Sequence, residues 1–191
     1  IFSAIAFSAK AIIIKLAYRH GVDAVTLLAL RMAISAPFFL AVAWWFGRGG
    51  HLAALGRGDW RAVVFLGLLG YYLASLFDFM GLQYISAGLE RLILYLNPTL
   101  VLLLSVVLLG KRLSARQAVA MVLSYAGVAV VFGQELQLAG THVALGASLV
   151  LASAVSYAVY LVYSGLWVQR LGALRLTGAA TSVASVLCIV Q

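Results

Sequence analysis

The chain has 191 residues, of which 65% are hydrophobic and 9% charged, and its mean hydropathy is +1.10. Soluble domains carry roughly 25% charged residues, so this composition excludes a protein whose whole surface faces water. The net charge of +8 would suit nucleic-acid binding in a soluble protein, but the basic residues here lie mostly between apolar segments. That placement indicates membrane topology and argues against a DNA-binding face.

Seven apolar segments follow one another along the chain, most of them near the roughly 17 to 25 residues that span a bilayer. Transmembrane helices are expected at residues 1–18, 24–46, 62–82, 85–109, 117–132, 142–165 and from 171 onward. The connections are rich in glycine and charge, and all but one are short. The sequence therefore predicts an all-α, polytopic transmembrane helical bundle with no inserted soluble domain.

The first and last segments are both interrupted by the ends of the chain, which indicates a fragment of a longer membrane protein. We interpret the first segment as a truncated helix rather than a signal peptide, because Lys10 interrupts it. The single cysteine, Cys188, and three scattered histidines form no metal-binding pattern. No metal or cofactor is expected.

Basic residues gather in alternate connections, and positively charged connections tend to stay in the cytoplasm. One side has Arg48, Arg57, Arg61, Lys111, Arg112, Arg116, Arg170 and Arg175. The other has Arg19 and, near a helix end, Arg91. We therefore expect a cytoplasmic N-terminus, in the inner (plasma) membrane of a bacterium.

The sixth segment repeats a loose pattern of the first. Ser8, Gly21 and Thr26 correspond in order to Ser156, Gly172 and Thr177. The second copy begins five segments after the first, and an odd offset gives the two copies opposite orientations across the membrane. This is the arrangement of secondary transporters built from inverted repeats.

Ionisable residues within the segments are functional candidates, because charge in hydrocarbon is costly unless it is paired or hydrated. Counted from the external helix ends, Lys15, Arg31, Asp78, Glu90 and Arg91 fall in one layer. Either they form an interhelical ion-pair network, or they line the outward mouth of a cavity. A carboxylate there could carry protons, and an arginine could hold a substrate carboxylate.

Lys10 lies deeper, roughly 12 Å from the external end of its segment, so it is expected to face protein or water. It could neutralise an anionic group, change protonation during a transport cycle, or form a buried salt bridge. In the fourth segment Pro98 removes a backbone hydrogen bond, which predicts a kink at Asn97-Pro98. The freed carbonyl oxygen indicates either a cavity wall or the packing of a kinked helix against its neighbours.

Polar stripes at helical spacing mark the third and sixth segments: Tyr71, Ser75 and Asp78 in one, and Ser153, Ser156, Tyr160 and Tyr163 in the other. Such stripes suit helix contacts as well as ligand sites. Close helix packing is expected at Gly67, Gly70, Gly81 and Gly127.

A set of motifs resembles the EamA-type repeat of the drug/metabolite transporter superfamily, over residues 7–132. The motifs are Gly81-Leu-Gln-Tyr-Ile-Ser-Ala-Gly88, Asn97-Pro98, Leu109-Gly-Lys-Arg-Leu-Ser114, Gln117, Ala126-Gly-Val128 and Arg31. Lys111 departs from the pattern, which usually has glutamate after the glycine.

The resemblance implies ten helices in two inverted five-helix repeats, of which this chain has about seven helices. The first repeat would cover residues 1–133, and residues 142–191 would begin the second. A central cavity is implied, with substrate or coupling residues at Lys10, Arg31, Asp78, Glu90, Asn97 and Tyr160.

The function expected is secondary transport of small metabolites by alternating access, with protons as a candidate coupling ion. The alternative is a membrane assembly or chaperone-like subunit that does not transport. No nucleophile and base pair or paired-acid spacing supports an enzyme.

Overall fold

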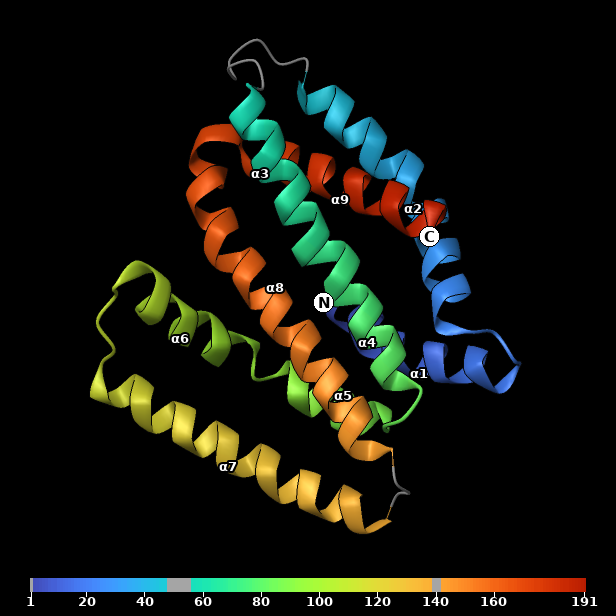
Figure 1. The fold of residues 1–191 in the computed structure, drawn as a ribbon, viewed down its shortest axis with the longest axis vertical. Helices are drawn as coiled ribbons and strands as arrows, with labels where there is room; N and C mark the ends of the chain where they lie inside the picture. The colour runs from blue at the N-terminus through green and yellow to red at the C-terminus, as the bar shows by residue number, and fades with distance from the viewer. Residues whose placement is uncertain (1, 48–55, 139–141) are drawn as a thin grey trace.

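The computed structural model describes residues 2–47, 56–138 and 142–191 (Figure 1). Within these ranges the chain is helical and has no β-strand, which confirms the predicted all-α fold. Ile1 and Arg48, which the sequence analysis placed in the first span and in a cytoplasmic connection, lie outside the described residues.

The described residues form seven spans, two of them subdivided. The first two are α1 (Phe2–Arg19) and α2 (Ala24–Gly47), and the last three are α7 (Ala115–Leu138), α8 (Val143–Leu171) and α9 (Ala173–Val190). The third span consists of α3 (Arg57–Gly67), η1 (Leu68–Leu73) and α4 (Ala74–Leu82), and the fourth of α5 (Ala87–Leu94) and α6 (Asn97–Leu109). Five of the seven are long and apolar enough to cross a membrane, as judged from length and composition.

The helix ends are fixed by short polar contacts. Asp23 accepts hydrogen bonds from the first turn of α2, and those from Thr26 hold the pKa of this exposed carboxyl below its usual range. Ser114 and Gln117 form a reciprocal capping box at the start of α7. Gly110 ends α6 with φ +64°, a left-handed conformation that suits glycine.

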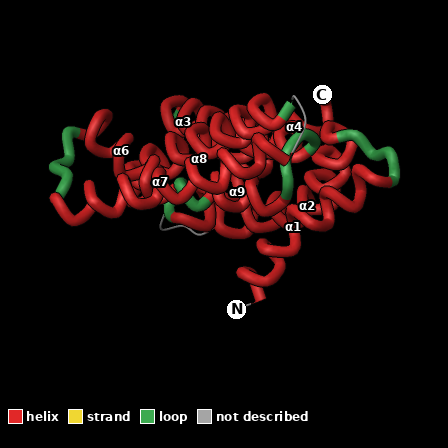
Figure 2. Tube along the Cα trace, turned by 90° about the horizontal axis from the view of Figure 1, so that it is seen from below, coloured by secondary structure: helices red, strands yellow, loops and turns green. Residues whose placement is uncertain are grey.

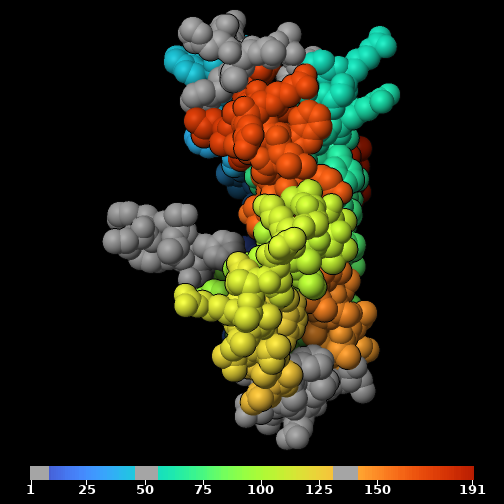
Figure 3. Space-filling model, turned by 90° about the vertical axis from the view of Figure 1, so that its left-hand side faces the viewer, coloured from blue at the N-terminus to red at the C-terminus, as the bar shows by residue number. Residues whose placement is uncertain are grey.

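The third span and α8 lie side by side across the middle of the molecule (Figure 1). On one side of this pair, α2 packs along α9. Seen from below, most helices form a flattened layer from which the N-terminal end of α1 extends (Figure 2). On the opposite edge, α6 and α7 form the surface nearest the viewer in Figure 3.

Small residues allow the central helices to approach closely. A Cβ atom added at Gly70 would lie 2.3 Å from Tyr160 Cγ, and one at Gly81 would lie 2.6 Å from Val150 Cγ2. Gly67 meets the backbone of α9 in the same way. These three packing predictions are confirmed. The prediction for Gly127 is wrong, because a Cβ atom there would meet nothing within 4 Å among the described residues.

Two spans are irregular near their middle. The kink predicted at Asn97-Pro98 is present: α5 ends at Leu94, and α6 begins at Asn97 with the proline in its first turn, where no backbone N–H is required. The π-helical turn η1 in the third span was not predicted. Its residues carry no sequence signal, because the contacts that accompany it come from other helices, α8 and α9.

Candidate functional site

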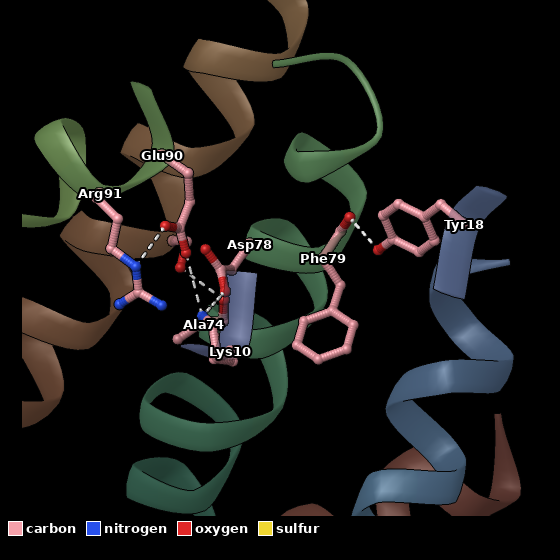
Figure 4. Close-up of polar contacts among 8 residues, drawn as sticks. Lys10, Tyr18, Ala74, Asp78, Phe79, Glu90 and Arg91 are labelled. Atoms are coloured by element: carbon pink, nitrogen blue, oxygen red, sulfur yellow. Dashed lines mark hydrogen bonds and ion pairs between the residues drawn. The ribbon is translucent and has the colours of Figure 1, made fainter. Parts of the chain in front are cut away.

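A buried charge cluster joins the first, third and fourth spans. It consists of Lys10 in α1, Asp78 in α4, and Glu90 and Arg91 in α5 (Figure 4). The Lys10 ammonium donates to Asp78 Oδ2 and lies 3.2 Å from Glu90 Oε1, while Arg91 Nε lies 3.2 Å from Glu90 Oε2. Glu90 is fully buried and Asp78 is 4% exposed. Two carboxylates at membrane depth are thus compensated by two cations.

The cluster corrects the depth assigned to Lys10 from the sequence. Counting from helix ends placed Lys10 below the layer that contains Asp78 and Glu90, whereas the structure brings all three side chains into contact. Residue counts are comparable between helices only if their ends are level, and the sequence does not contain that information. Lys15, assigned to the same layer, instead lines a separate hollow of about 800 Å³ beside the α1–α2 connection.

A cavity of about 480 Å³ lies beside the cluster. Its walls come from the first, second, third, fourth and sixth spans, through Lys10, Arg31, Gly70, Tyr71, Ala74, Ser75, Asp78, Arg91, Leu94, Tyr95, Asn97, Pro98, Ser153 and Tyr157. The volume is within the usual range for small-molecule sites. A small metabolite would fit.

The structure brings four of the six predicted site residues to this cavity: Lys10, Arg31, Asp78 and Asn97. Glu90 does not line it, but contacts Lys10 from behind. Tyr160 also lies behind the wall, 6% exposed, and its hydroxyl is 3.0 Å from that of Tyr71. Its distance from the cavity reflects how the sixth span is rotated, which helical spacing alone does not determine.

Serine hydroxyls from α8 hold the wall formed by the third span. Ser153 Oγ donates to the carbonyl oxygen of Ala74 at 2.6 Å, and Ser156 Oγ donates to that of Leu69 at 2.8 Å. These carbonyls lie within and just after η1, where the regular helical hydrogen-bond pattern is interrupted. The polar stripe on the sixth span therefore makes helix contacts, and only its edge at Ser153 and Tyr157 reaches the cavity.

Several cavity-lining residues were missed as candidates, including Gly70, Leu94 and Tyr95. Leu94 and Tyr95 flank the break before Asn97, so the proline that predicted the kink was a usable signal for them. Gly70 had been assigned to packing. It has both roles, because it contacts Tyr160 on one side and lines the cavity on the other.

Arg31 differs from the other charged residues of the cavity. Its guanidinium lies 5.5 Å from the ring centroid of Phe79, and no carboxylate among the described residues lies within ion-pair distance of it. On another wall, Asn97 Oδ1 is buried and has no hydrogen-bond donor within the described ranges. The cavity thus offers a cation that no described carboxylate balances.

A further ion pair fixes which connections share a side of the bundle. Arg170 Nη2, near the end of α8, lies 3.1 Å from Asp59 Oδ2, at the start of α3. The start of the third span and the end of the sixth are therefore on the same face. This agrees with the grouping of their basic residues in the sequence.

The helical architecture and the apolar spans define a polytopic integral membrane protein with ionised side chains at membrane depth. The sequence model of the EamA-like transporter family matches residues 1–133. The chain belongs to this family, which confirms the resemblance inferred from the Gly81–Gly88, Asn97-Pro98 and Leu109–Ser114 motifs.

Individual relatives of the chain are also named as transporters. The chain is 31% identical over 187 residues to an uncharacterized transporter of Bacillus subtilis named YcbK, covering 94% of this chain and 57% of the relative. It is 28% identical over 128 residues to an uncharacterized transporter of Archaeoglobus fulgidus, covering 67% of this chain and 45% of the relative. The chain thus spans about half the length of these curated relatives. No solved structure gives a significant match.

Proposed function

We propose that the full-length protein is a secondary transporter that moves small metabolites across the bacterial inner membrane by alternating access. The observation that carries the proposal is the cavity of about 480 Å³ with Lys10, Arg31 and Asp78 in its wall. Ionised side chains at membrane depth are costly, and they typically line substrate or ion pathways.

The packing of α2 along α9 supports two inverted repeats, the first over residues 1–133 and the second beginning at 142. These helices are the second span of each proposed repeat, and equivalent helices meet at a pseudo-twofold axis. Gly21 and Gly172, which end the first span of each repeat, have similar φ values of +80° and +78°. The substrate cavity of the complete protein lies between the repeats.

Protons are the coupling ion in this proposal, and Asp78 is the carboxylate that binds them. It lines the cavity, so water can reach it, whereas Glu90 is fully buried. Protonation of Asp78 removes one partner of Lys10 and weakens the contact between α1 and α4. This change of charge at a contact between spans shifts the equilibrium between the two access states.

The N-terminus is placed in the cytoplasm in this proposal. The face that contains the Asp59–Arg170 pair also has most of the basic connections, and such faces are usually cytoplasmic.

The test is uptake of a labelled metabolite panel into proteoliposomes that contain the full-length protein, with and without an imposed pH gradient. Saturable uptake that responds to the gradient is expected. Folded protein that shows no flux with any compound would favour the alternative, a membrane assembly subunit whose buried charges are structural.

A further inference from the structure

The charges around the cavity do not balance. Three cations, Lys10, Arg31 and Arg91, accompany two carboxylates, Asp78 and Glu90. Lys10 contacts both carboxylates, and Arg91 contacts Glu90. Arg31 is left as a cation to which the described part of the chain supplies no carboxylate within ion-pair distance, so the site as a whole has a formal charge of +1.

Arg31 is held in place without a counter-ion. Its guanidinium lies over the ring of Phe79. Phe79 is only 1% exposed, and its backbone carbonyl oxygen accepts a 2.7 Å hydrogen bond from the Tyr18 hydroxyl. A cation stacked on a fixed aromatic ring keeps its N–H groups available for another partner. The side chain is exposed and lines the cavity.

An uncompensated charge at membrane depth is unfavourable by several kcal/mol, and an anion that enters the cavity removes that penalty. Guanidinium groups bind carboxylates through two parallel hydrogen bonds. A monocarboxylate would bring the formal charge of the site to zero. A phosphate monoester, with a charge of about −1.5 to −2 at neutral pH, would overcompensate it.

We infer that the cavity selects small monocarboxylates, with Arg31 binding the carboxylate. This deepens the proposed transport function, because it uses the same cavity. It names the charge of the substrate, which the transport proposal leaves open.

Binding to the purified full-length protein tests the inference without requiring transport. Thermal unfolding is measured with matched probes that differ in charge but little in shape: 4-hydroxybenzoate against 4-hydroxybenzamide, and lactate against lactamide. A ligand that binds the folded state raises the unfolding temperature. At least one carboxylate is expected to stabilise the protein, while its amide is not.

Three variants assign the effect to Arg31. Arg31→Gln is expected to weaken carboxylate binding at least about tenfold, and Arg31→Lys is expected to retain part of it, since lysine keeps the charge but not the planar fork. Arg116→Gln is the matched control, because Arg116 is exposed at the start of α7, outside the cavity. It should bind as the wild type does.

Three results would overturn the inference: equal stabilisation by carboxylates and amides, an unchanged carboxylate effect in Arg31→Gln, or no stabilisation by any carboxylate. If Arg31→Gln does not fold, the wild-type probe pairs and Arg31→Lys decide. If only neutral or cationic compounds show saturable uptake, the transport proposal is supported and the selection of monocarboxylates is contradicted. If carboxylates bind in a way that depends on Arg31 but no compound is transported, the selection of monocarboxylates is supported and the transport proposal is contradicted.

Discussion

The hydroxyl of Ser156 in α8 donates a 2.8 Å hydrogen bond to the carbonyl oxygen of Leu69, within the π-helical turn of the third span. With Ser153, it connects the sixth span to the segment from which the cavity wall is built. The π turn is thus supported by a different span from the one that contains it.

Ser156→Ala is expected to lower the free energy of unfolding by about 1 kcal/mol, because interhelical hydrogen bonds in membranes contribute about that much. Unfolding of the full-length protein by titration with sodium dodecyl sulfate provides the measurement. Ser164→Ala is the matched control, since the Ser164 hydroxyl bonds to a carbonyl of its own helix. Equal losses in the two variants would contradict a role for the contact between spans.

Replacing Lys10 should lower the free energy of unfolding far more than replacing Lys15 on the same helix. Lys10→Met leaves Asp78 and Glu90 without their shared partner, and breaking a buried ion pair costs roughly 3–5 kcal/mol. The additional change Asp78→Asn should recover part of this loss. Both effects are measured as the free energy of unfolding of the full-length protein.

Lys15→Met serves as the comparison for Lys10, five residues further along the same helix and outside the charge cluster. It is expected to cost no more than about 1 kcal/mol. A similar loss in both lysine variants, or no recovery with Asp78→Asn, would show that the cluster does not control the stability of the bundle.

Gly70→Ala should destabilise the contact between the third and sixth spans. The added methyl group would lie 2.3 Å from Tyr160 Cγ, and overpacking of this kind costs typically 1–3 kcal/mol. Gly127→Ala has open space around the new Cβ atom within the described structure, so it should be neutral or stabilising. Detergent unfolding of both variants tests the difference, and a neutral Gly70→Ala would mean that the helices are not in close contact.

Asp78→Asn should separate transport from coupling. Asparagine keeps the shape of the side chain but does not bind a proton, and the Lys10–Glu90 contact remains to hold α1. We expect exchange of labelled for unlabelled substrate to continue, while accumulation driven by a pH gradient is lost. If Asp78→Asn still accumulates substrate in response to the gradient, the coupling proton binds elsewhere.

The orientation can be tested with single cysteines in a cysteine-free background of the full-length protein, in which Cys188 is replaced by serine. Arg112→Cys, between α6 and α7, should react with a membrane-impermeant maleimide only after the inner membrane is opened. His20→Cys, between α1 and α2, should react with the same maleimide while the inner membrane is intact. The opposite labelling pattern would place the N-terminus outside the cytoplasm.

The sequence alone was sufficient for the order and approximate limits of the seven helical segments, five of which are long and apolar enough to cross a membrane. This is because the bilayer imposes a length and an apolar composition that can be read from a window of residues. It also identified the break at Asn97-Pro98, since proline acts on its own backbone. The family followed from short contiguous motifs, such as Leu109–Ser114 in the connection between the fourth and fifth segments.

Only the tertiary structure decided which charges meet and which face the cavity. Lys10 and Glu90 are 80 residues apart in the chain, and their contact depends on the tilt and stagger of α1 and α5. The same holds for the π turn at Leu68–Leu73, which packs against α8 and α9. It also holds for Tyr160, which the rotation of α8 places behind the cavity wall. Such relationships arise from packing between helices, and no local pattern of residues contains them.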